Sequence, residues 1–491
     1  MYKTILGKMF LLFMVEGILF AGCSNDEGTF PAGKKVNDEI YYANMFGKEV
    51  MEQFYYWNGE IESDLQTWNI ETNEDPIGTV DRIKYHEGDK YIDKWTMLTD
   101  DMESFNANVG GVSTTFGWNL TIYLLNQEST QCIGVVNFVH RDTPAARAGL
   151  KRGDIIIGLN GTDLTTGNYL DLYHVPSLTV SLGRLDMENN IIVSQGKEVE
   201  LTAVTTYEDP VLCDSVYEFG GKKVGYLAYS AFDLRSVDKL VEIGRHFKAE
   251  GVSELVLDLR YNGGGYVITE NVLASMFAPQ QAVSNQEIFE RDDYNDYLTE
   301  LYCKQGVSTD TRFTTEFNYP SNGVNVSTKD ANIGLTKIYG LISRGSASAS
   351  EALLGGLMPY MDVQLIGTSS SGKYCTGWML GAEDAYENCP NEIRNWGIYL
   401  MVSIYKNAVG ETPCMPDGLQ PDVEVEDEPI LPYALGDVNE PLLREALKQA
   451  GRPYDGEVVV PSTRIPSLRF RQMPPVLKPN FGKRIQFPLF K

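Results

Sequence analysis

Short apolar runs alternate with amphipathic stretches along the second half of the chain. Residues 223–229, 255–257, 336–342 and 363–367 are mostly apolar, which is the pattern of strands buried on both faces of a sheet. Residues 237–247 instead place apolar side chains at helical spacing. The alternation of strand and helix patterns predicts an α/β core.

The predicted strand at 336–342 runs into a turn of small residues, 345–351, and residues 352–358 have the pattern of a helix that leaves this turn. A serine hydroxyl becomes nucleophilic when a neighbouring base removes its proton, and a buried lysine with a lowered pKa is such a base. Lys373 lies in a second small-residue turn, after the apolar run 363–367. The two turns indicate a Ser-Lys hydrolase, and spacing alone leaves three candidate nucleophiles: Ser346, Ser348 and Ser350.

The start of the predicted helix is also suited to stabilise a developing oxyanion. The first N–H groups of a helix lack partners within it, and the helix dipole favours negative charge there. Ala349 N–H is the predicted donor. Residues 348–351 also fit the capping box [ST]-x-x-[DE], so an ordinary helix cap is the alternative interpretation of the same turn.

Three segments in the same order resemble the active-site sequences of the tail-specific, or C-terminal processing, serine proteases. They are residues 258–265, Asp-Leu-Arg-Tyr-Asn-Gly-Gly-Gly; residues 345–351; and Gly367 with Gly372-Lys373. The resemblance implies that Ser348 attacks and that Lys373 is its base. It also implies an α/β, ClpP/crotonase-like catalytic core with repeated ββα units. A later segment, 417–423, extends the similarity to about residue 430.

The glycine loop 258–265 is the predicted source of a second oxyanion donor. Glycine lets backbone N–H groups approach a substrate carbonyl closely, and it adopts positive φ without steric cost. Gly264 and Gly265 are both candidates. An ordinary turn after a strand is the alternative interpretation of these glycines.

One position departs from the family pattern. Many members carry a glutamine four residues after the lysine, where this chain has Gly377, and the residue that orients Lys373 is left unassigned between Thr376 and Ser371. A weakly oriented lysine is a slower base. The alternative function is therefore a catalytically weak or inactive peptide- or ligand-binding protein on the same scaffold.

Other chemistries find less support in the sequence. Residues 367–373 match the first seven positions of a P-loop, but Tyr374 stands where Ser or Thr must hold magnesium, and a strand-like stretch follows. The four histidines accompany no G-x-S-x-G elbow, and neither H-E-x-x-H nor C-x-x-C occurs. We therefore expect no cofactor and no metal site.

A PDZ-like module is predicted before the catalytic core. Residues 143–161 resemble the helix, turn and strand of a PDZ domain, and the candidate carboxylate-binding loop contains Phe116, Gly117 and Trp118. PDZ modules bind an extended peptide as an added strand and hold its terminal carboxylate on backbone N–H groups. Trp118 is equally consistent with a core aromatic residue. The substrate is then expected to be a protein or peptide with a free C-terminus.

The ends of the chain predict targeting and docking segments. A basic start, an apolar run and Ala21-Gly22-Cys23 resemble a bacterial lipoprotein signal, which implies lipidation at Cys23 and a location in the cell envelope; an ordinary secretory signal is the alternative.

The last thirty residues hold seven Lys or Arg and no Asp or Glu, in a chain of net charge −26, so this tail is expected to dock on the acidic body or to stay mobile. The negative charge also argues against nucleic acid as a partner.

Most of the six cysteines after Cys23 are expected to be free and buried, with Cys375 and Cys389 the first pair to inspect for a disulfide. The predicted organisation of the chain has six parts. The predicted parts are a signal peptide (1–22), a tether (23–35), a helical N-terminal domain (36–105), a PDZ-like domain (106–206), a catalytic domain (207–450) and a basic, proline-rich tail (451–491).

Overall fold

The computed structural model describes residues 35–125, 130–186, 191–453, 471–474, 476 and 481–489. The predicted signal peptide, Cys23 and nearly all of the predicted tether lie outside the described residues. Within the described part of the chain, none of the helices has both the length and the apolar character needed to cross a membrane.

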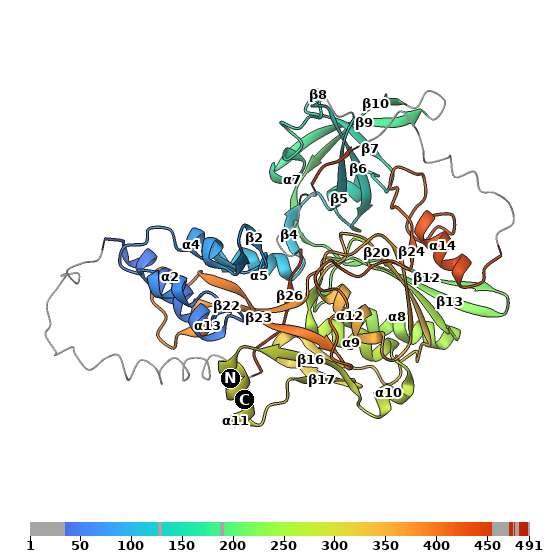
Figure 1. The fold of residues 1–491 in the computed structure, drawn as a ribbon. Coiled ribbons are helices and arrows are strands. Elements are labelled where there is room, and N and C mark those ends of the chain that lie inside the picture. Colours follow the sequence, from blue (N-terminus) through green and yellow to red (C-terminus); the bar gives the residue numbers. More distant parts are fainter. Residues whose placement is uncertain are drawn as a thin grey trace, which may run out of the picture.

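A six-stranded sheet forms the base of the catalytic region (Figure 1). Its apolar strands are parallel from the second to the last, and only the first runs antiparallel. In order they are β12 (Val211–Phe219), β13 (Lys222–Tyr229), β14 (Glu254–Asp258), β20 (Lys337–Ile342), β21 (Asp362–Gly367) and β24 (Val423–Glu424). The four apolar runs singled out above all lie in strands of this sheet.

Helices cover both faces of this sheet, which explains why its strands are apolar throughout. Alternate residues of β13 point to opposite faces: Leu227 packs with helices α8, α9 and α12, whereas Tyr226 packs with α14. The helices are α8 (Val237–Glu250), α9 (Val267–Phe277), α12 (Ala349–Leu357) and α14 (Pro441–Gln449). Helix α8 ends at Gly251, which adopts the left-handed conformation of a C-cap with φ 73°.

A second sheet packs on the other side of α9 and α12 and contains segments from distant parts of the chain. Its order is β15 (Gly265–Tyr266), β26 (Arg484–Ile485), β22 (Cys375–Gly381), β23 (Gly397–Asn407), β16 (Ile288–Tyr294) and β17 (Asp310–Arg312), with β3 (Met97–Thr99) paired to β23. Strand β26 belongs to the basic tail and lies between β15 and β22. The described end of the tail is therefore docked in the sheet.

The N-terminal region is mainly helical and packs against the extended end of β22 and β23 (Figure 1). Its elements are α2 (Asp38–Phe54), α3 (Glu62–Thr67), α4 (Pro76–Ile83), β1 (His86–Glu87), β2 (Lys90–Tyr91) and α5 (Met102–Val109). The buried face of α2 includes Phe46, Val50 and Phe54. These side chains share one core with the catalytic sheets.

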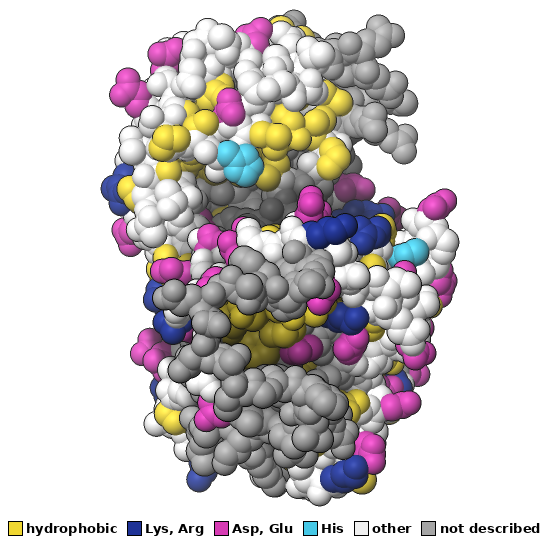
Figure 2. Space-filling view, turned by 90° about the vertical axis from the view of Figure 1, so that its left-hand side faces the viewer, with side chains coloured by type: hydrophobic (Ala, Val, Ile, Leu, Met, Phe, Trp, Pro, Cys, Tyr) yellow, Lys and Arg dark blue, Asp and Glu magenta, His cyan; other side chains and the backbone are white. Residues whose placement is uncertain are grey.

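A separate sheet with its own hydrophobic core forms the module predicted to resemble a PDZ domain. Figure 2 shows it as the upper body, with a hollow between it and the rest of the molecule on this face. Its strand order is β10 (Ile191–Thr202), β9 (Ser177–Asp186), β7 (Ile155–Leu159), β6 (Cys132–Val139), β5 (Trp118–Leu124) and β25 (Arg471–Gln472), with β8 (Thr162–Asp163) paired to β7. Two short helices, α6 (Pro144–Arg147) and α7 (Asp171–His174), complete it.

The remaining elements connect or extend these bodies. They are β4 (Val112–Thr115), β11 (Val204–Tyr207), α10 (Gln280–Ser284), α11 (Asp296–Gln305), β18 (Glu316–Tyr319), η1 (Pro320–Asn322), β19 (Val324–Ser327), α13 (Ala382–Ala385) and η2 (Asn391–Ile393). All six cysteines of the described residues are free, Cys375 and Cys389 included.

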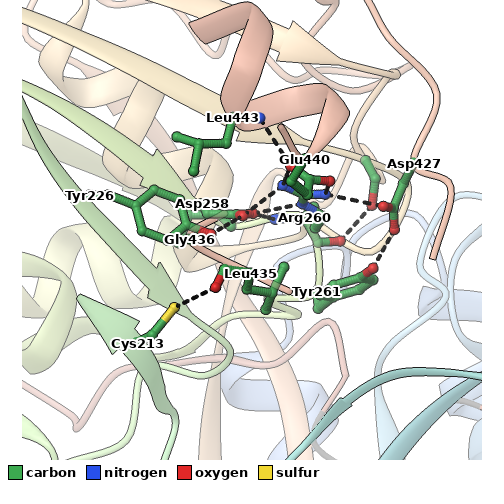
Figure 3. A network of polar contacts seen from close by, with 12 residues as sticks. Cys213, Tyr226, Asp258, Arg260, Tyr261, Asp427, Leu435, Gly436, Glu440 and Leu443 are labelled. Atoms are coloured by element: carbon green, nitrogen blue, oxygen red, sulfur yellow. Dashed lines mark hydrogen bonds and ion pairs between the residues drawn. The ribbon is translucent and has the colours of Figure 1, made fainter. Parts of the chain in front are cut away.

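A buried ion-pair network joins the PDZ-like module to the catalytic region. Asp427 accepts from Arg152 of the module at 2.6 Å and from Arg260 at 3.0 Å. Figure 3 shows Arg260 held between Asp258, Asp427 and Glu440. Burial alone would raise the pKa of the Asp427 carboxyl, but the two arginines hold it at about 2. The start of the glycine loop is thus fixed to α14 and to the PDZ-like module at once.

Candidate active site

The three serines of the turn before α12 have different environments. Ser346 Oγ donates to the Leu259 carbonyl at 2.8 Å, and Ser350 Oγ donates to the Asn262 carbonyl at 2.9 Å. Ser348 Oγ donates to no acceptor among the residues that the structure describes, although it faces the Glu351 N–H as part of the capping box that starts α12. Because Ser346 and Ser350 use their hydroxyls to hold the turn against the glycine loop, Ser348 is the serine with a hydroxyl left for chemistry.

The backbone of Ser348 adopts an uncommon conformation. Its φ is 66° and its ψ is −117°, on the side of the φ/ψ map that non-glycine residues rarely occupy. Such a conformation costs about 1–3 kcal/mol and tends to be kept at functional sites. Ala349 is the first residue of α12, so its N–H has no acceptor within the helix. The predicted nucleophile and its predicted oxyanion donor therefore both stand at the start of a buried helix.

The glycine loop lies directly against this turn. A Cβ at Gly264 would stand 2.7 Å from Ser348 Cβ, and Gly264 has φ +106°, so only glycine fits there. Asn262 supports the loop, because its Oδ1 accepts from Gly264 N–H at 2.9 Å and its Nδ2 donates to the Tyr229 carbonyl at 3.0 Å. Neither predicted donor is open in this structure, because Gly264 N–H is engaged by Asn262 and Gly265 pairs with Arg484 of β26.

Lys373 is fully buried in a pocket of aromatic and sulfur-containing side chains. Its Nζ donates to the Cys375 carbonyl at 2.9 Å and to Tyr399 Oη at 3.3 Å, and it lies 4.9 Å from the centre of the Trp95 ring. Burial lowers the pKa of the Lys373 ammonium, although Cys375 and Asp93 oppose this shift. The direction agrees with the mostly apolar pocket that a neutral lysine base requires.

One carboxylate holds the two turns together. Glu351 Oε2 accepts both from Ser348 N–H at 2.8 Å and from Lys373 N–H at 2.9 Å, and Oε1 accepts from Gly372 N–H at 2.6 Å. The Ser370 hydroxyl donates to Oε1 as well. Because a single oxygen binds the backbones of Ser348 and Lys373, these residues are immediate neighbours in space. In the sequence, Glu351 was visible only as the acidic member of a capping box.

The hydrogen bond that the sequence hypothesis requires between Ser348 Oγ and Lys373 Nζ is not formed in this structure. The physical reason is that the Lys373 amine donates to the Cys375 carbonyl and the Tyr399 hydroxyl and not to Ser348 Oγ. The lysine side chain has four rotatable bonds, and its backbone adjoins that of the serine. The Ser-Lys hypothesis therefore requires this side chain to rotate away from its present partners.

The space left by the missing glutamine is filled by a tyrosine. A Cβ at Gly377 would stand 2.5 Å from the Tyr399 ring, so a larger residue cannot occupy that position. Tyr399 reaches this place from β23, the neighbouring strand, and contacts Lys373 through its hydroxyl. The two residues considered from the sequence have other contacts, since Thr376 Oγ1 meets Asp292 and Arg484, and Ser371 N–H donates to the Ser346 carbonyl. Tyr399, which the sequence did not single out, is thus the hydroxyl that contacts the Lys373 amine in this structure.

The P-loop alternative is not supported by the local fold. Residues 367–373 lead into strand β22 rather than into a helix. A phosphate-binding loop relies on the N–H groups and dipole of the helix that follows it. Without that helix, Lys373 has no cradle for nucleotide phosphates beside it.

The aromatic side chains of the candidate carboxylate loop belong to the core of the PDZ-like module. Phe116 and Trp118 are buried in the module's core, and Trp118 Nε1 donates to the Leu172 carbonyl at 3.2 Å. Gly117 has φ +85°, and a Cβ there would stand 2.1 Å from Thr143 Cβ. The side chain of Trp118 is therefore a core aromatic residue. Strand β5 follows directly after the loop.

Replacement of Glu351 by glutamine is expected to lower kcat about 10- to 100-fold with a smaller change in KM. An amide has one acceptor oxygen where the carboxylate has two, so some of the hydrogen bonds that join the serine and lysine turns are lost. Small displacements of reacting groups lower the rate strongly. Steady-state kinetics would measure this split, with Glu392→Gln on the exposed surface as the matched control. A Glu351→Gln protein with wild-type kcat would show that the hydrogen bonds of Glu351 do not position Ser348 and Lys373.

Comparisons with known proteins agree with the fold and the order of the modules. Residues 223–425 match peptidase family S41, and residues 135–173 match the PDZ domain. A carboxyl-terminal-processing protease of Synechocystis is 24% identical over 305 residues, which cover 60% of this chain and 58% of that protein. The carboxy-terminal processing protease CtpB of Bacillus subtilis is 26% identical over 293 residues, covering 58% and 50%. The match thus spans 58% of the length of the first relative and 50% of that of the second.

A solved structure extends the similarity of the fold. The crystal structure of a putative S41 protease from Bacteroides fragilis superimposes with a TM-score of 0.67 and 24% identity, covering 88% of this chain and all of that one. The predicted α/β catalytic core and the predicted PDZ-like module are both confirmed by these matches.

Proposed function

We propose that this chain, which carries a peptidase family S41 domain behind a PDZ domain, is a serine endopeptidase that acts near the C-termini of proteins through Ser348 and Lys373. The observation that carries the proposal is the arrangement around Glu351. It binds the backbones of Ser348 and Lys373 through one oxygen, while the serine hydroxyl donates to no acceptor among the described residues and the lysine is buried.

The proposed mechanism begins with a neutral Lys373. After its side chain turns from the Cys375 carbonyl towards Ser348, Nζ accepts the hydroxyl proton while Oγ attacks the carbonyl carbon of the scissile peptide bond. The negative oxygen of the tetrahedral intermediate is held by the N–H group of Ala349 and by that of Gly264 or Gly265. Lys373 then returns the proton to the leaving amine. A water molecule, deprotonated by the same lysine, releases the acyl group from Ser348.

The PDZ domain gives this reaction a preference for C-terminal regions. A peptide end bound as an added strand on the PDZ sheet is held far from the bond to be cut, and the binding energy of that remote contact is used to position the bond. The network of Arg152, Asp427 and Arg260 connects the two sites through buried contacts. Peptides with a blocked C-terminus are therefore expected to be poorer substrates.

The function is tested with an unfolded protein substrate and product analysis by mass spectrometry. Matched peptides with a free or an amidated C-terminus should differ mainly in KM, and the Ser348→Ala protein serves as the control for contaminating proteases. The absence of cleavage by the parent protein across a panel of unfolded substrates would reject the proposal in favour of a non-catalytic binding protein.

The pH dependence of kcat/KM should report the lowered pKa of Lys373. The base must be neutral, so kcat/KM rises about tenfold per pH unit below that pKa and then levels off, at a pH below the ordinary lysine value of about 10.4. Between the two values the unfolded lysine holds a proton that the folded one lacks, so the free energy of unfolding rises with pH over the same window. A pH profile with a substrate free of titratable groups measures the midpoint, and a midpoint at or above pH 10 contradicts the assignment.

We further propose that the protein is attached to a bacterial membrane by lipid on Cys23. The support is the basic and apolar segment that ends in Ala21-Gly22-Cys23. Metabolic labelling with a fatty acid and membrane fractionation of the Cys23→Ala protein decide this point, since retention of label or of membrane association by the variant would exclude Cys23 as the anchor.

A further inference from the structure

The basic tail contacts both sites at which a peptide would bind. Strand β25 pairs antiparallel with β5 of the PDZ domain, with Arg471 opposite Leu124 and Gln472 opposite Tyr123. Strand β26 pairs parallel with β15 and lies between β15 and β22 of the catalytic region. One segment of the chain thus occupies a PDZ strand edge and a strand position next to the glycine loop.

The second contact brings the tail to the candidate nucleophile. Lys483 O lies 2.8 Å, and Ser348 Cβ 2.7 Å, from the point where a Cβ on Gly264 would stand. Gly482 N–H donates to the Gly263 carbonyl at 2.8 Å, so the tail runs along the glycine loop by backbone pairing. Ser348 and Lys373 are both 0% exposed in this arrangement. A peptide substrate cannot reach them while the tail is in place.

The side chains of the tail fill pockets of matching chemistry. Arg484 is fully buried and pairs with Glu270 of α9, with Nε at 2.9 Å and Nη2 at 2.8 Å, and with Glu290 of β16. Lys483 Nζ lies 4.3 Å from the centre of the Tyr399 ring and donates to the Trp95 carbonyl at 3.4 Å. A guanidinium is well matched to such a site, because its planar fork binds carboxylates through paired hydrogen bonds.

The acidic pocket contains more carboxyl groups than the tail neutralises. Asp292 lies beside Glu270 and Glu290 and accepts from Gln486 Nε2 at 3.3 Å. Burial raises the pKa of Glu290, and the nearby Glu270 and Asp292 add to this effect despite Arg484. The contacts of Arg484 with Glu270 and Glu290 show that the pocket favours a cation, because a guanidinium offsets the mutual repulsion of these carboxyl groups and an apolar or acidic side chain does not.

We propose that the space between β15 and β22 is the peptide-binding channel of the catalytic domain and that it favours an extended basic peptide with arginine in the Glu270–Glu290 pocket. In this structure residues 481–487 of the tail occupy the channel as an intramolecular competitor of substrate. The charge pattern supports this occupant, since the last thirty residues carry seven basic and no acidic side chains in a chain of net charge −26. The claim that displacing the tail frees the nucleophile rests on the proposed function, whereas the binding claim does not.

The binding claim is tested without catalysis, in a Ser348→Ala background. A specific protease site is placed between residues 453 and 471, and after cleavage the tail is removed from the folded protein. A fluorescein-labelled peptide of residues 469–491 is then titrated and followed by anisotropy. We expect binding to the stripped protein but not to the uncut one, and Arg484→Ala in the peptide should weaken binding at least about tenfold, which is 1.4 kcal/mol.

The matched control peptide carries Arg471→Ala, which removes one charge at a strand that pairs through its backbone. It should bind within about threefold of the parent peptide. Equal affinities of the Arg484→Ala and Arg471→Ala peptides, or no binding to a stripped protein that keeps its folded circular dichroism spectrum, would overturn the proposal.

A reversible lock covers the case in which the stripped protein does not stay folded. Tyr266 and Ile485 are register partners where β15 pairs with β26, and neighbouring strands lie about 4.8 Å apart, within the Cα separation that a disulfide spans, so the lock is formed by Tyr266→Cys and Ile485→Cys. Exposed Cys303 is first replaced by serine. In the Ser348→Ala background the reduced protein should bind the labelled peptide and the oxidised protein should not; equal binding by both forms would refute a displaceable tail.

The same lock in the active background separates the two proposals. Cleavage of a basic peptide substrate should be lost on oxidation and restored by reductant. If neither form cleaves any substrate while peptide binding remains redox-dependent, the proposed function fails and the binding channel stands. If both forms cleave at the same rate, the tail does not compete with substrate and the inference is wrong.

Discussion

Replacement of Ser348 by alanine is expected to reduce kcat on a peptide substrate by about 10⁴- to 10⁶-fold. The physical reason is that no neighbouring hydroxyl can take over, because Ser346 and Ser350 donate to the Leu259 and Asn262 carbonyls and are turned away from the reaction. The measurement is the rate of product formation with saturating peptide, together with a thermal melt to confirm the fold.

Ser346→Ala and Ser350→Ala are the matched controls for this prediction. Each loses one buried hydrogen bond, which costs about 1 kcal/mol of stability, and each should retain measurable cleavage. Full activity of the Ser348→Ala protein would assign the nucleophile to another serine. Complete inactivity of a well-folded Ser346→Ala protein would then identify Ser346 as that residue.

Replacement of Lys373 by methionine is expected to reduce kcat about 10²- to 10⁴-fold, the usual contribution of a positioned base. Methionine has a similar length and no charge, and the pocket formed by Trp95, Tyr399 and Met401 accommodates an apolar side chain. Since burying an amine is unfavourable, the thermal stability of the variant at pH 7 should equal or exceed that of the parent. Kinetics and calorimetry on the same preparations measure both effects.

Lys483 is the necessary comparison, because it is a second buried lysine beside Tyr399. Burial, together with the charge of Lys373, lowers the pKa of Lys483 to about 7, so pKa alone would make it a base. Lys373 differs in that its backbone is bound to the same Glu351 oxygen as Ser348. The Lys483→Met protein should therefore still cleave substrate, and loss of cleavage in Lys483→Met but not in Lys373→Met would reverse the assignment.

The local pattern of the sequence was sufficient to find the strand, turn and helix that carry Ser348. The apolar run 336–342 forms β20, and the small residues after it form the predicted turn into α12. Spacing left three serines open because the distinction depends on distant acceptors, the carbonyls of Leu259 and Asn262, whose position only the folded chain defines. The two-turn hypothesis was thus accessible from sequence, and the choice among serines was not.

The supporting contacts of the site were not accessible for the same reason. Glu351 reads as a helix cap until the loop at Gly372 and Lys373 is brought to its other side. Tyr399 replaces the expected glutamine from a neighbouring strand, which requires knowledge of the register between β22 and β23. Only the glycine at position 377 hinted, by its small size, that a large side chain from elsewhere fills that space.

The tail was the least predictable element. Strand β26 has two residues and no periodic pattern, and its partner Gly265 lies more than two hundred positions earlier in the chain. Charge indicated that the tail could dock on an acidic body, and the described residues 481–489 do so. Composition could not indicate where, because the receiving carboxyl groups come from α9 and β16, which are adjacent only in the folded protein.

The position of β26 also sets an order for biosynthesis. Ribosomes deliver β15, β22 and β23 well before Arg484 and Ile485, so a nascent polypeptide passes through a stage in which β15 and β22 have bare edges. Unpaired strand edges are open to pairing with other strands until β26 covers them. The second sheet is therefore complete only after β26, which follows β23 by more than seventy residues, has paired between β15 and β22.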